Sequence, residues 1–279
     1  MPYDCITLLT DYGYGGGFVG ALHAVALGIA PGVPVIDLDH AIPPQDVRLG
    51  ALRLERLIAY TPPGVHVAVV DPGVGGDRRP LAVETAGRVF VGPDNGLLVW
   101  AAERCGPLQG VTVLEEQGYW LSPRSRTFDG RDVFVPVAAR LATGLDLAKL
   151  GPRVDPGSLV TLDRPAARRQ DDGSLLTEVV QVDTFGNVQF AAGGSGAAGD
   201  VLGLLPGTEV HVEPAGGAGA PVEALVGFTF DDVPAGTPVL LVDSDGCLAL
   251  SVNRGRADEL SGLQPGDLVT IRASGGALR

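Results

Sequence analysis

The stretch Val67-Ala-Val-Val70, followed by Asp71-Pro-Gly-Val-Gly-Gly-Asp-Arg78, indicates a buried strand that ends in a glycine-rich turn. An apolar run that stops at an acidic residue is typical of open α/β sheets, which bind their ligands at the carboxyl ends of the strands. The glycines permit a sharp reversal, so Arg78 can fold back over the turn towards Asp71. By itself this pair is equally compatible with a functional site and with a structural anchor for the loop.

Composition indicates a globular protein with one large domain or two ordinary ones, because the chain has 279 residues, 45% of them hydrophobic and 19% charged. The net charge of −13 disfavours nucleic acid and anionic membrane surfaces as partners and is compatible with a cationic small molecule. No apolar run reaches the roughly 18 residues of a membrane span, and residues 5–9 enter a strand pattern directly. We therefore expect neither a membrane segment nor a secretory signal.

Cysteine and histidine usage gives no sign of a metal centre. The three cysteines are widely spaced and match no metal-binding pattern, so we expect reduced thiols in a cytoplasmic protein. The four histidines each stand alone in a strand or helix pattern, where packing or hydrogen bonding is the more common role. We expect no bound metal.

Residues 1–163 alternate strand and helix patterns, which predicts an α/β domain with a mostly parallel sheet covered by helices. The strands are expected at residues 6–9, 33–38, 66–70 and 111–114, with a hairpin at 81–84 and 88–91, and the helices at 17–29, 46–59 and 132–142.

Residues 164–173 have the composition of a linker, and residues 174–279 predict an antiparallel, β-barrel-like domain. Strands are expected at residues 178–182, 209–212, 222–226, 239–242, 247–252 and 268–271, and loops in the glycine- and alanine-rich segments 191–199 and 214–220.

Polar clusters fall at predicted strand ends or turns of the first domain. Asp11 is either a carboxylate that holds sugar hydroxyls or the N-cap of the helix that follows. Asp94 and Asn95 lie in a Pro-Asp-Asn-Gly sequence, which also builds tight turns. The Asp-Gly at residues 129–130 either belongs to a site or caps the next helix.

The second domain contributes further clusters around residues 183–187, 230–232 and 244–255. Phe185 or Phe230 can stack on an aromatic base. Asp183 and Asn187 can grip the head group of an amino acid. Each of these residues, taken singly, is more often part of a turn or of a core.

Taken together and in order, the clusters resemble the S-adenosylmethionine hydroxide adenosyltransferases, hydrolytic relatives of the fluorinases and chlorinases. Any one stretch is weak evidence, whereas six in register are specific. The matching stretches, which span nearly the whole chain, are Leu9-Thr-Asp11-Tyr-Gly, Ile42-Pro-Pro-Gln-Asp46-Val, Val69-Val-Asp71-Pro-Gly-Val-Gly with Arg78-Arg79, Pro93-Asp-Asn-Gly96, Thr127-Phe-Asp-Gly-Arg-Asp132 and Asp183-Thr-Phe-Gly-Asn187.

The resemblance implies an α/β domain, a β-barrel-like domain and a homotrimer, with S-adenosylmethionine bound between the first domain of one subunit and the second domain of its neighbour. It implies Asp71, Arg78 and Asp129 as catalytic residues, and no cofactor besides the substrate itself. The substrate-binding residues that it implies are Asp11 for the ribose, Asp183 and Asn187 for the methionine or adenine ends, Phe230 and Arg254 for the adenine side, and Asp94, Asn95, Phe128, Gly130 and Phe185 as further candidates.

Two positions depart from the family pattern. Asp129 stands where the hydrolases typically have a histidine, and Gly16 stands where relatives commonly have an aspartate that contacts methionine.

Halogenases of the superfamily carry a tyrosine at the position of Asp71. A carboxylate there repels a halide and suits water, although Gly130 matches a glycine of the chlorinase.

The resulting hypothesis is hydrolysis: water attacks the 5′ carbon of S-adenosylmethionine in line, while Asp71 accepts its proton and Arg78 stabilises the developing hydroxide. If Asp129 shares the same arginine, repulsion between the two carboxylates favours protonation of one of them. That aspartate then becomes a better base near neutral pH. One alternative is a non-catalytic sensor of S-adenosylmethionine or adenosine. The other is a halide-using adenosyl transferase, against which the carboxylate of Asp71 argues.

Overall fold

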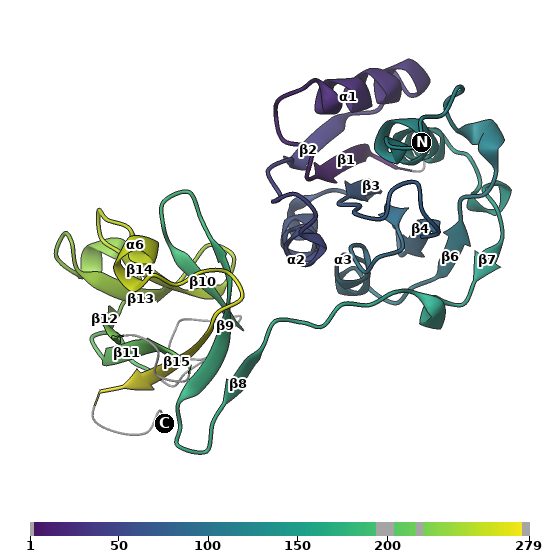
Figure 1. The fold of residues 1–279 in the computed structure, drawn as a ribbon. Helices are drawn as coiled ribbons and strands as arrows, with labels where there is room; N and C mark the ends of the chain where they lie inside the picture. Colours follow the sequence, from purple (N-terminus) through teal and green to yellow (C-terminus); the bar gives the residue numbers. More distant parts are fainter. Residues whose placement is uncertain (1–2, 194–203, 216–219, 275–279) are drawn as a thin grey trace. The chain divides into compact units, whose positions relative to one another are not determined.

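The computed structural model describes residues 3–193, 204–215 and 220–274, and the chain divides into two compact units, Met1–Leu162 and Asp163–Arg279 (Figure 1). Each unit has its own hydrophobic core. The segment expected as a linker, residues 164–173, carries strand β8 (Ala167–Arg169), which pairs with a strand of unit 2. That segment is therefore part of the second sheet as well as a connection.

In the described residues, unit 1 contains a seven-stranded sheet in the order β2-β1-β3-β5-β4-β6-β7. The neighbours β2, β1, β3 and β5 are parallel, and β4, β6 and β7 complete the sheet by antiparallel pairing. The predicted parallel-rich α/β domain is confirmed. The strands are β1 (Cys5–Thr10), β2 (Val35–Asp39), β3 (Gly64–Val69), β4 (Pro80–Thr85), β5 (Arg88–Pro93), β6 (Gly110–Val113) and β7 (Arg153–Val154).

Helices cover both faces of this sheet (Figure 1). Helices α1 (Phe18–Ile29) and α4 (Val135–Ala142) pack on one face, and α2 (Val47–Leu57) and α3 (Val99–Arg104) pack on the other. Because both faces are covered, β1 and β3 are buried along their whole length, which explains why they read as continuous apolar runs. Helix α3 was not predicted from the sequence.

Short helical turns complete unit 1. The helix predicted at residues 132–142 begins as a π-helical turn, η3 (Gly130–Phe134), and continues as α4. The 3₁₀ turns of unit 1 are η1 (Ile58–Tyr60), η2 (Gln117–Tyr119), η4 (Leu147–Lys149) and η5 (Pro156–Ser158). Within the described ranges, no helix is both long enough and apolar enough to cross a membrane.

Unit 2 is a closed barrel of seven strands among the described residues, in the order β9-β10-β14-β13-β12-β11-β15, with β8 added outside β9. Neighbouring strands are antiparallel except β12 and β13, so the predicted β-barrel-like domain is confirmed. The elements are β9 (Leu175–Val182), β10 (Val188–Gly193), β11 (Glu209–Pro214), β12 (Val222–Val226), β13 (Pro238–Val242), β14 (Cys247–Val252), β15 (Leu268–Ala273), the 3₁₀ turn η6 (Phe230–Asp232) and helix α6 (Ala257–Ser261).

The two predicted loops of unit 2 are only partly testable. Residues 191–193 belong to β10, so the prediction of a loop is wrong there, and residues 194–199 lie outside the described residues. Pro214 ends β11, and residues 216–219 also lie outside the described residues.

A buried histidine on β3 makes the stability of unit 1 depend on pH. His66 Nδ1 lies 2.9 Å from Thr7 Oγ1, and Arg88 donates to its Nε2. Burial, and then the charge of Arg88, lower the pKa of His66 to about 3. The unfolded chain takes up this proton near pH 6.5, so the free energy of unfolding falls as the pH drops below that value, by about 1.4 kcal/mol per pH unit.

We predict that the parent protein loses about 2 kcal/mol more unfolding free energy than the His66→Gln variant between pH 7 and pH 5. Urea titrations at the two pH values measure the difference. Equal losses in parent and variant would show that His66 is not buried in its neutral form.

Candidate active site

Three strand ends bring candidate residues of unit 1 to one edge of the sheet. Thr10 at the end of β1 pairs with Val69 at the end of β3, and β5 runs parallel beside β3. Asp11, Asp71 and Asn95 therefore follow neighbouring parallel strands at the same carboxyl edge. The helices that leave β1 and enter β3 lie on opposite faces, and open α/β sheets bind their ligands at such a switch point.

Asp71 and Arg78 form a close ion pair at this edge. Arg78 Nε lies 2.9 Å and Nη2 2.5 Å from Asp71 Oδ2, and Nε lies 3.2 Å from Oδ1. Their side chains are only 5% and 11% exposed. Gly75 makes the turn possible, because its φ is +78° and a Cβ there would lie 2.6 Å from the carbonyl oxygen of Arg126.

Asp129 joins the pair and also contacts a second arginine. Its Oδ2 accepts from Arg78 Nη2 at 2.6 Å and from Arg124 Nη2 at 3.0 Å, and its Oδ1 accepts from Arg124 Nε and Nη2 at 3.0 and 2.8 Å. Asp71 and Asp129 therefore share Arg78, as expected from the sequence, and Asp129 has Arg124 as a second positive partner. Sequence reasoning missed Arg124, although this arginine lies only five residues before Asp129.

Arg78 remains charged in these surroundings. Burial opposes its charge, but the hydrogen bonds and charges of Asp71 and Asp129 outweigh burial and raise the pKa of the guanidinium. The guanidinium also stacks over the Phe134 ring, with 5.3 Å from its central carbon to the ring centroid. The cluster therefore holds a fixed positive charge against the Asp71 carboxylate.

An aromatic wall lies beside the charged cluster. Tyr12 contacts Phe128 edge-on, with 5.5 Å between ring centroids, and Phe18 contacts both rings. Burial and the nearby carboxylates of Asp11, Asp71 and Asp129 raise the pKa of Tyr12, so its hydroxyl stays protonated. A Cβ at Gly130 would lie 2.5 Å from the Tyr12 hydroxyl, which explains why glycine occupies this position.

Asp11 does not cap a helix, and Asp129 occupies the N-cap position of η3 without a capping bond from its side chain. The N-cap of α1 is Gly17 and that of η3 is Asp129, and neither helix start has a side-chain capping bond. Asp11 instead accepts a hydrogen bond from the backbone N–H of Gln45 at 2.9 Å. The capping alternative is therefore wrong for Asp11, whereas Asp129 holds the N-cap position and directs its side chain to Arg78 and Arg124 instead of the helix backbone.

Asp94 and Asn95 hold the local structure around the cluster. Asp94 pairs with Arg79, with 2.8 Å from Nε to Oδ2, and accepts from the backbone N–H of Val160 at 3.0 Å. Asn95 Nδ2 donates to the carbonyl of Val70 at 2.8 Å. Asn95 thus fixes the residue directly before Asp71.

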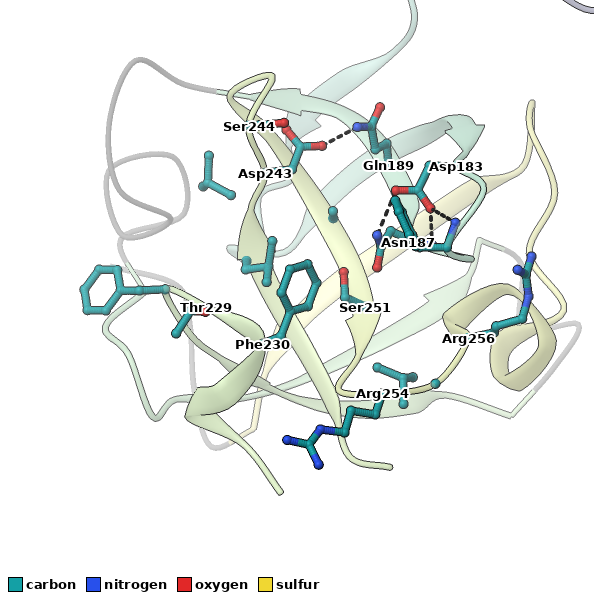
Figure 2. A pocket seen from close by; sticks show the side chains of 17 residues that line it. Asp183, Asn187, Gln189, Thr229, Phe230, Asp243, Ser244, Ser251, Arg254 and Arg256 are labelled. Carbon is teal, nitrogen blue, oxygen red and sulfur yellow. Dashed lines mark hydrogen bonds between the residues drawn. The ribbon is translucent and has the colours of Figure 1, made fainter. Parts of the chain in front are cut away.

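Unit 2 contains a cavity of about 780 Å³ lined by the candidate residues of this domain (Figure 2). They are Asp183, Phe185, Asn187, Phe230 and Arg254, joined among others by Gln189, Phe228, Asp243, Ser251 and Arg256. The cavity walls combine exposed aromatic rings with convergent polar groups, which suits an aromatic ligand with a polar tail.

The polar residues of the cavity differ in how many hydrogen-bonding positions they leave open to a ligand. Asp183 Oδ1 accepts from the backbone N–H groups of Phe185 and Asn187, and its Oδ2 accepts from Asn187 Nδ2 (Figure 2). Ser251 Oγ is buried and has no hydrogen-bond partner among the described residues. Sequence reasoning missed Ser251, because a serine inside a strand carries no local signal.

The described part of the chain holds no group of three or more His, Cys, Asp or Glu side chains placed to bind a metal ion.

The fold, the charged cluster of unit 1 and the cavity of unit 2 together define the class of the protein. It pairs an α/β unit, with a buried carboxylate–guanidinium pair at a strand edge, and a β-barrel unit with a cavity lined by aromatic and polar side chains.

Comparison with known proteins identifies the family. Models of the N-terminal and C-terminal domains of the SAM hydroxide adenosyltransferases match residues 6–151 and 177–270. The chain belongs to this family, as its motifs indicated.

Two hydrolases and one solved structure match this chain along almost their whole length. An (R)-S-adenosyl-L-methionine hydrolase of Salinispora arenicola is 46% identical over 270 residues, which cover 96% of this chain and 97% of the relative. The hydrolase of the same name from Salinispora tropica is 44% identical over 273 residues, covering 98% and 99%. The crystal structure of an uncharacterized conserved protein from Thermotoga maritima has a TM-score of 0.86 and 33% identity, covering 95% of this chain and 99% of that one.

We predict that Gly130→Ala destabilises the protein by about 1–3 kcal/mol, because the new methyl group overlaps Tyr12, which Phe18 and Phe128 hold in place. Urea unfolding measures the change. Gly20→Ala in α1 is the control, since a Cβ there has no atom within 4 Å, and it should stabilise by up to about 1 kcal/mol. A Gly130→Ala variant as stable as the parent would contradict the packing of Tyr12.

Proposed function

We propose that the protein hydrolyses S-adenosyl-L-methionine to adenosine and L-methionine, by attack of a water molecule on the 5′ carbon of the ribose. The observation that carries the proposal is the Asp71–Arg78 pair, a buried carboxylate and guanidinium at the edge where open α/β sheets bind ligands. The family and the names of the relatives support the choice of substrate.

The chemistry needs an activated nucleophile and little else. The O–C5′ bond forms as the C5′–S bond breaks, and sulfur keeps the electron pair, so methionine leaves as a neutral thioether. Because a sulfonium is already an excellent leaving group, the step requires no general acid, metal or cofactor. The nucleophile is the difficulty, since water has a pKa of about 15.7.

The hydrogen bonds of the pair indicate which atoms act on the water. Asp71 Oδ2 accepts from two nitrogens of Arg78, whereas among the described residues Oδ1 accepts only from Nε at 3.2 Å. We therefore assign Oδ1 to take the proton of the water. Arg78 Nη1 is hydrogen-bonded to none of the described residues, and we assign it to the developing hydroxide.

Asp129 is better suited to orienting Arg78 than to accepting a proton. Both of its oxygens are occupied by guanidinium groups, and its side chain is 1% exposed. A carboxylate bonded in this way has no free position directed at a water molecule. The catalytic role proposed for Asp129 is therefore to hold Arg78 beside Asp71.

Substrate recognition is divided between the two units. Asp11, which follows the strand next to β3, is proposed to hold the ribose hydroxyls, beside the wall that contains Phe128 and Gly130. In unit 2, Phe185 and Phe230 offer exposed ring surface for the adenine, with Arg254 beside it. Asp183, Asn187 and Ser251 are proposed to contact the polar ends of the substrate.

We propose a homotrimer in which the substrate contacts unit 1 of one subunit and unit 2 of its neighbour. The charged pair and the aromatic cavity belong to different units, and Phe185 and Phe228 at the cavity are 75% and 64% exposed, as expected for rings that a ligand or partner covers. The three cysteines are widely spaced in the sequence, which is in keeping with reduced thiols in a cytoplasmic protein.

Halide transfer is the less favoured chemistry. A halide near the Asp71–Arg78 pair would also meet the carboxylate of Asp129. The space left by the missing side chain of Gly130 is filled by the Tyr12 hydroxyl.

A sensor that only binds the substrate is also less favoured. Binding alone does not require a carboxylate and a guanidinium with unoccupied hydrogen-bonding positions at the strand edge.

We predict that the purified protein converts S-adenosylmethionine to adenosine and methionine, and that in ¹⁸O-water the label appears in the 5′ hydroxyl of adenosine. Asp71→Asn should lower kcat by about 10²–10⁴-fold, because it removes the proton acceptor. Asp77→Asn is the matched control, an exposed acid in the same loop, and should keep the parent rate. Chromatography with mass spectrometry measures products and label.

Three outcomes would contradict the proposal. No adenosine above the blank, with the same trace for Asp71→Asn, rejects hydrolysis, and tight calorimetric binding without turnover then supports the sensor. Formation of 5′-chloro-adenosine when chloride is supplied supports halide transfer. Label in homoserine, with methylthioadenosine as the other product, places the attack on the methionine side.

A further inference from the structure

Arg124 lies between the charged cluster and the surface, in the loop that precedes η3. Its Nε and Nη2 both bond Asp129 Oδ1, at 3.0 and 2.8 Å, and Nη2 also reaches Oδ2 at 3.0 Å. Its guanidinium stacks over the Trp120 ring, with 4.7 Å from its central carbon to the ring centroid. These contacts hold a long side chain in one position, with its charge directed at one buried acid.

The need for this contact follows from the geometry of Arg78. A single nitrogen, Nη2, serves both carboxylates, at 2.5 Å from Asp71 Oδ2 and 2.6 Å from Asp129 Oδ2. Without Arg124, two buried negative charges would compete for one positive charge. With Arg124, the chain of Asp71, Arg78, Asp129 and Arg124 carries two charges of each sign.

We propose that Arg124 is a positioning residue for the hydrolysis: it neutralises Asp129, and thereby leaves Arg78 committed to Asp71 and Asp71 ionised as the proton acceptor. This inference rests on the proposed function. Arg124 acts through Asp129 and need not touch the substrate.

The groups that set the charge of Asp129 come from three segments. They are Arg78 and Asp71 from the loop after β3, Tyr12 from the loop after β1, and Arg124 from its own loop. Tyr12 stays neutral, so Arg124 is the partner, besides Arg78, whose removal takes a positive charge from the cluster. In its absence, the two carboxylates share Arg78 and take up a proton at a higher pH, which removes the base.

The pH profile of Arg124→Gln tests this role. We expect the acid limb of kcat to move up by about one pH unit and kcat at neutral pH to fall about tenfold, with KM little changed. Arg124→Lys should shift the limb by less, because it keeps the charge. In Arg124→Gln/Asp129→Asn, Arg78 is no longer shared, and the limb should return to the parent position even if the maximal rate is lower.

Arg131 provides a matched control. It pairs with the buried Asp132 at 2.7 Å, is 35% exposed like Arg124, and stacks on Phe128, but contacts neither Asp71 nor Arg78. Arg131→Gln should lower the free energy of unfolding about as much as Arg124→Gln does. It should leave the acid limb of the kcat profile at the same pH as in the parent.

The outcomes separate the inference from the proposed function. An active parent whose Arg124→Gln variant keeps the parent profile, or shifts no more than Arg131→Gln, would overturn the role of Arg124 alone. A parent without hydrolytic activity would contradict the proposed function, and the role of Arg124 with it. If Arg124→Gln does not fold, the lysine variant and the double variant decide the question in the same way.

Discussion

The contact between Asp71 and Arg78 is the interaction on which the site depends. The fold creates it in three steps: β3 is buried between β1 and β5, Asn95 fixes the carbonyl of Val70, and the glycine turn returns Arg78 to the strand end. A carboxylate and a guanidinium held in this way are charged before any substrate arrives. Preorganisation of this kind removes most of the cost of reorganising water during the reaction.

Charge balance explains how the two buried acids of this cluster of four ionic side chains are tolerated. Buried ion pairs are costly when one partner is missing, and each carboxylate here has a guanidinium at hydrogen-bonding distance. The aromatic neighbours Phe134 and Trp120 cover the two arginines without competing for their hydrogen bonds. The cluster can therefore exclude water from one side and still offer unoccupied positions on Asp71 and Arg78 to a ligand.

The sequence predicted those parts of the structure that rest on local pattern. Asp71 follows an apolar run, and the hairpin around Gly87 has a turn signal, so both could be recognised. Arg124 could not, because its loop has no periodicity and its partner is chosen by tertiary packing. The bond from Asn95 to Val70 depends on β5 lying beside β3, which no local pattern encodes. The order of the six motifs carried the functional prediction further than any single residue.

The most direct test of the central claim is a crystal structure of the protein with S-adenosylmethionine or a non-hydrolysable analogue. The account predicts Asp71 Oδ1 and Arg78 Nη1 on the side of the 5′ carbon opposite the sulfur, with one water molecule in contact with all three. A structure in which the carboxylate of Asp71 bonds only within its own loop, far from the 5′ carbon, would contradict it.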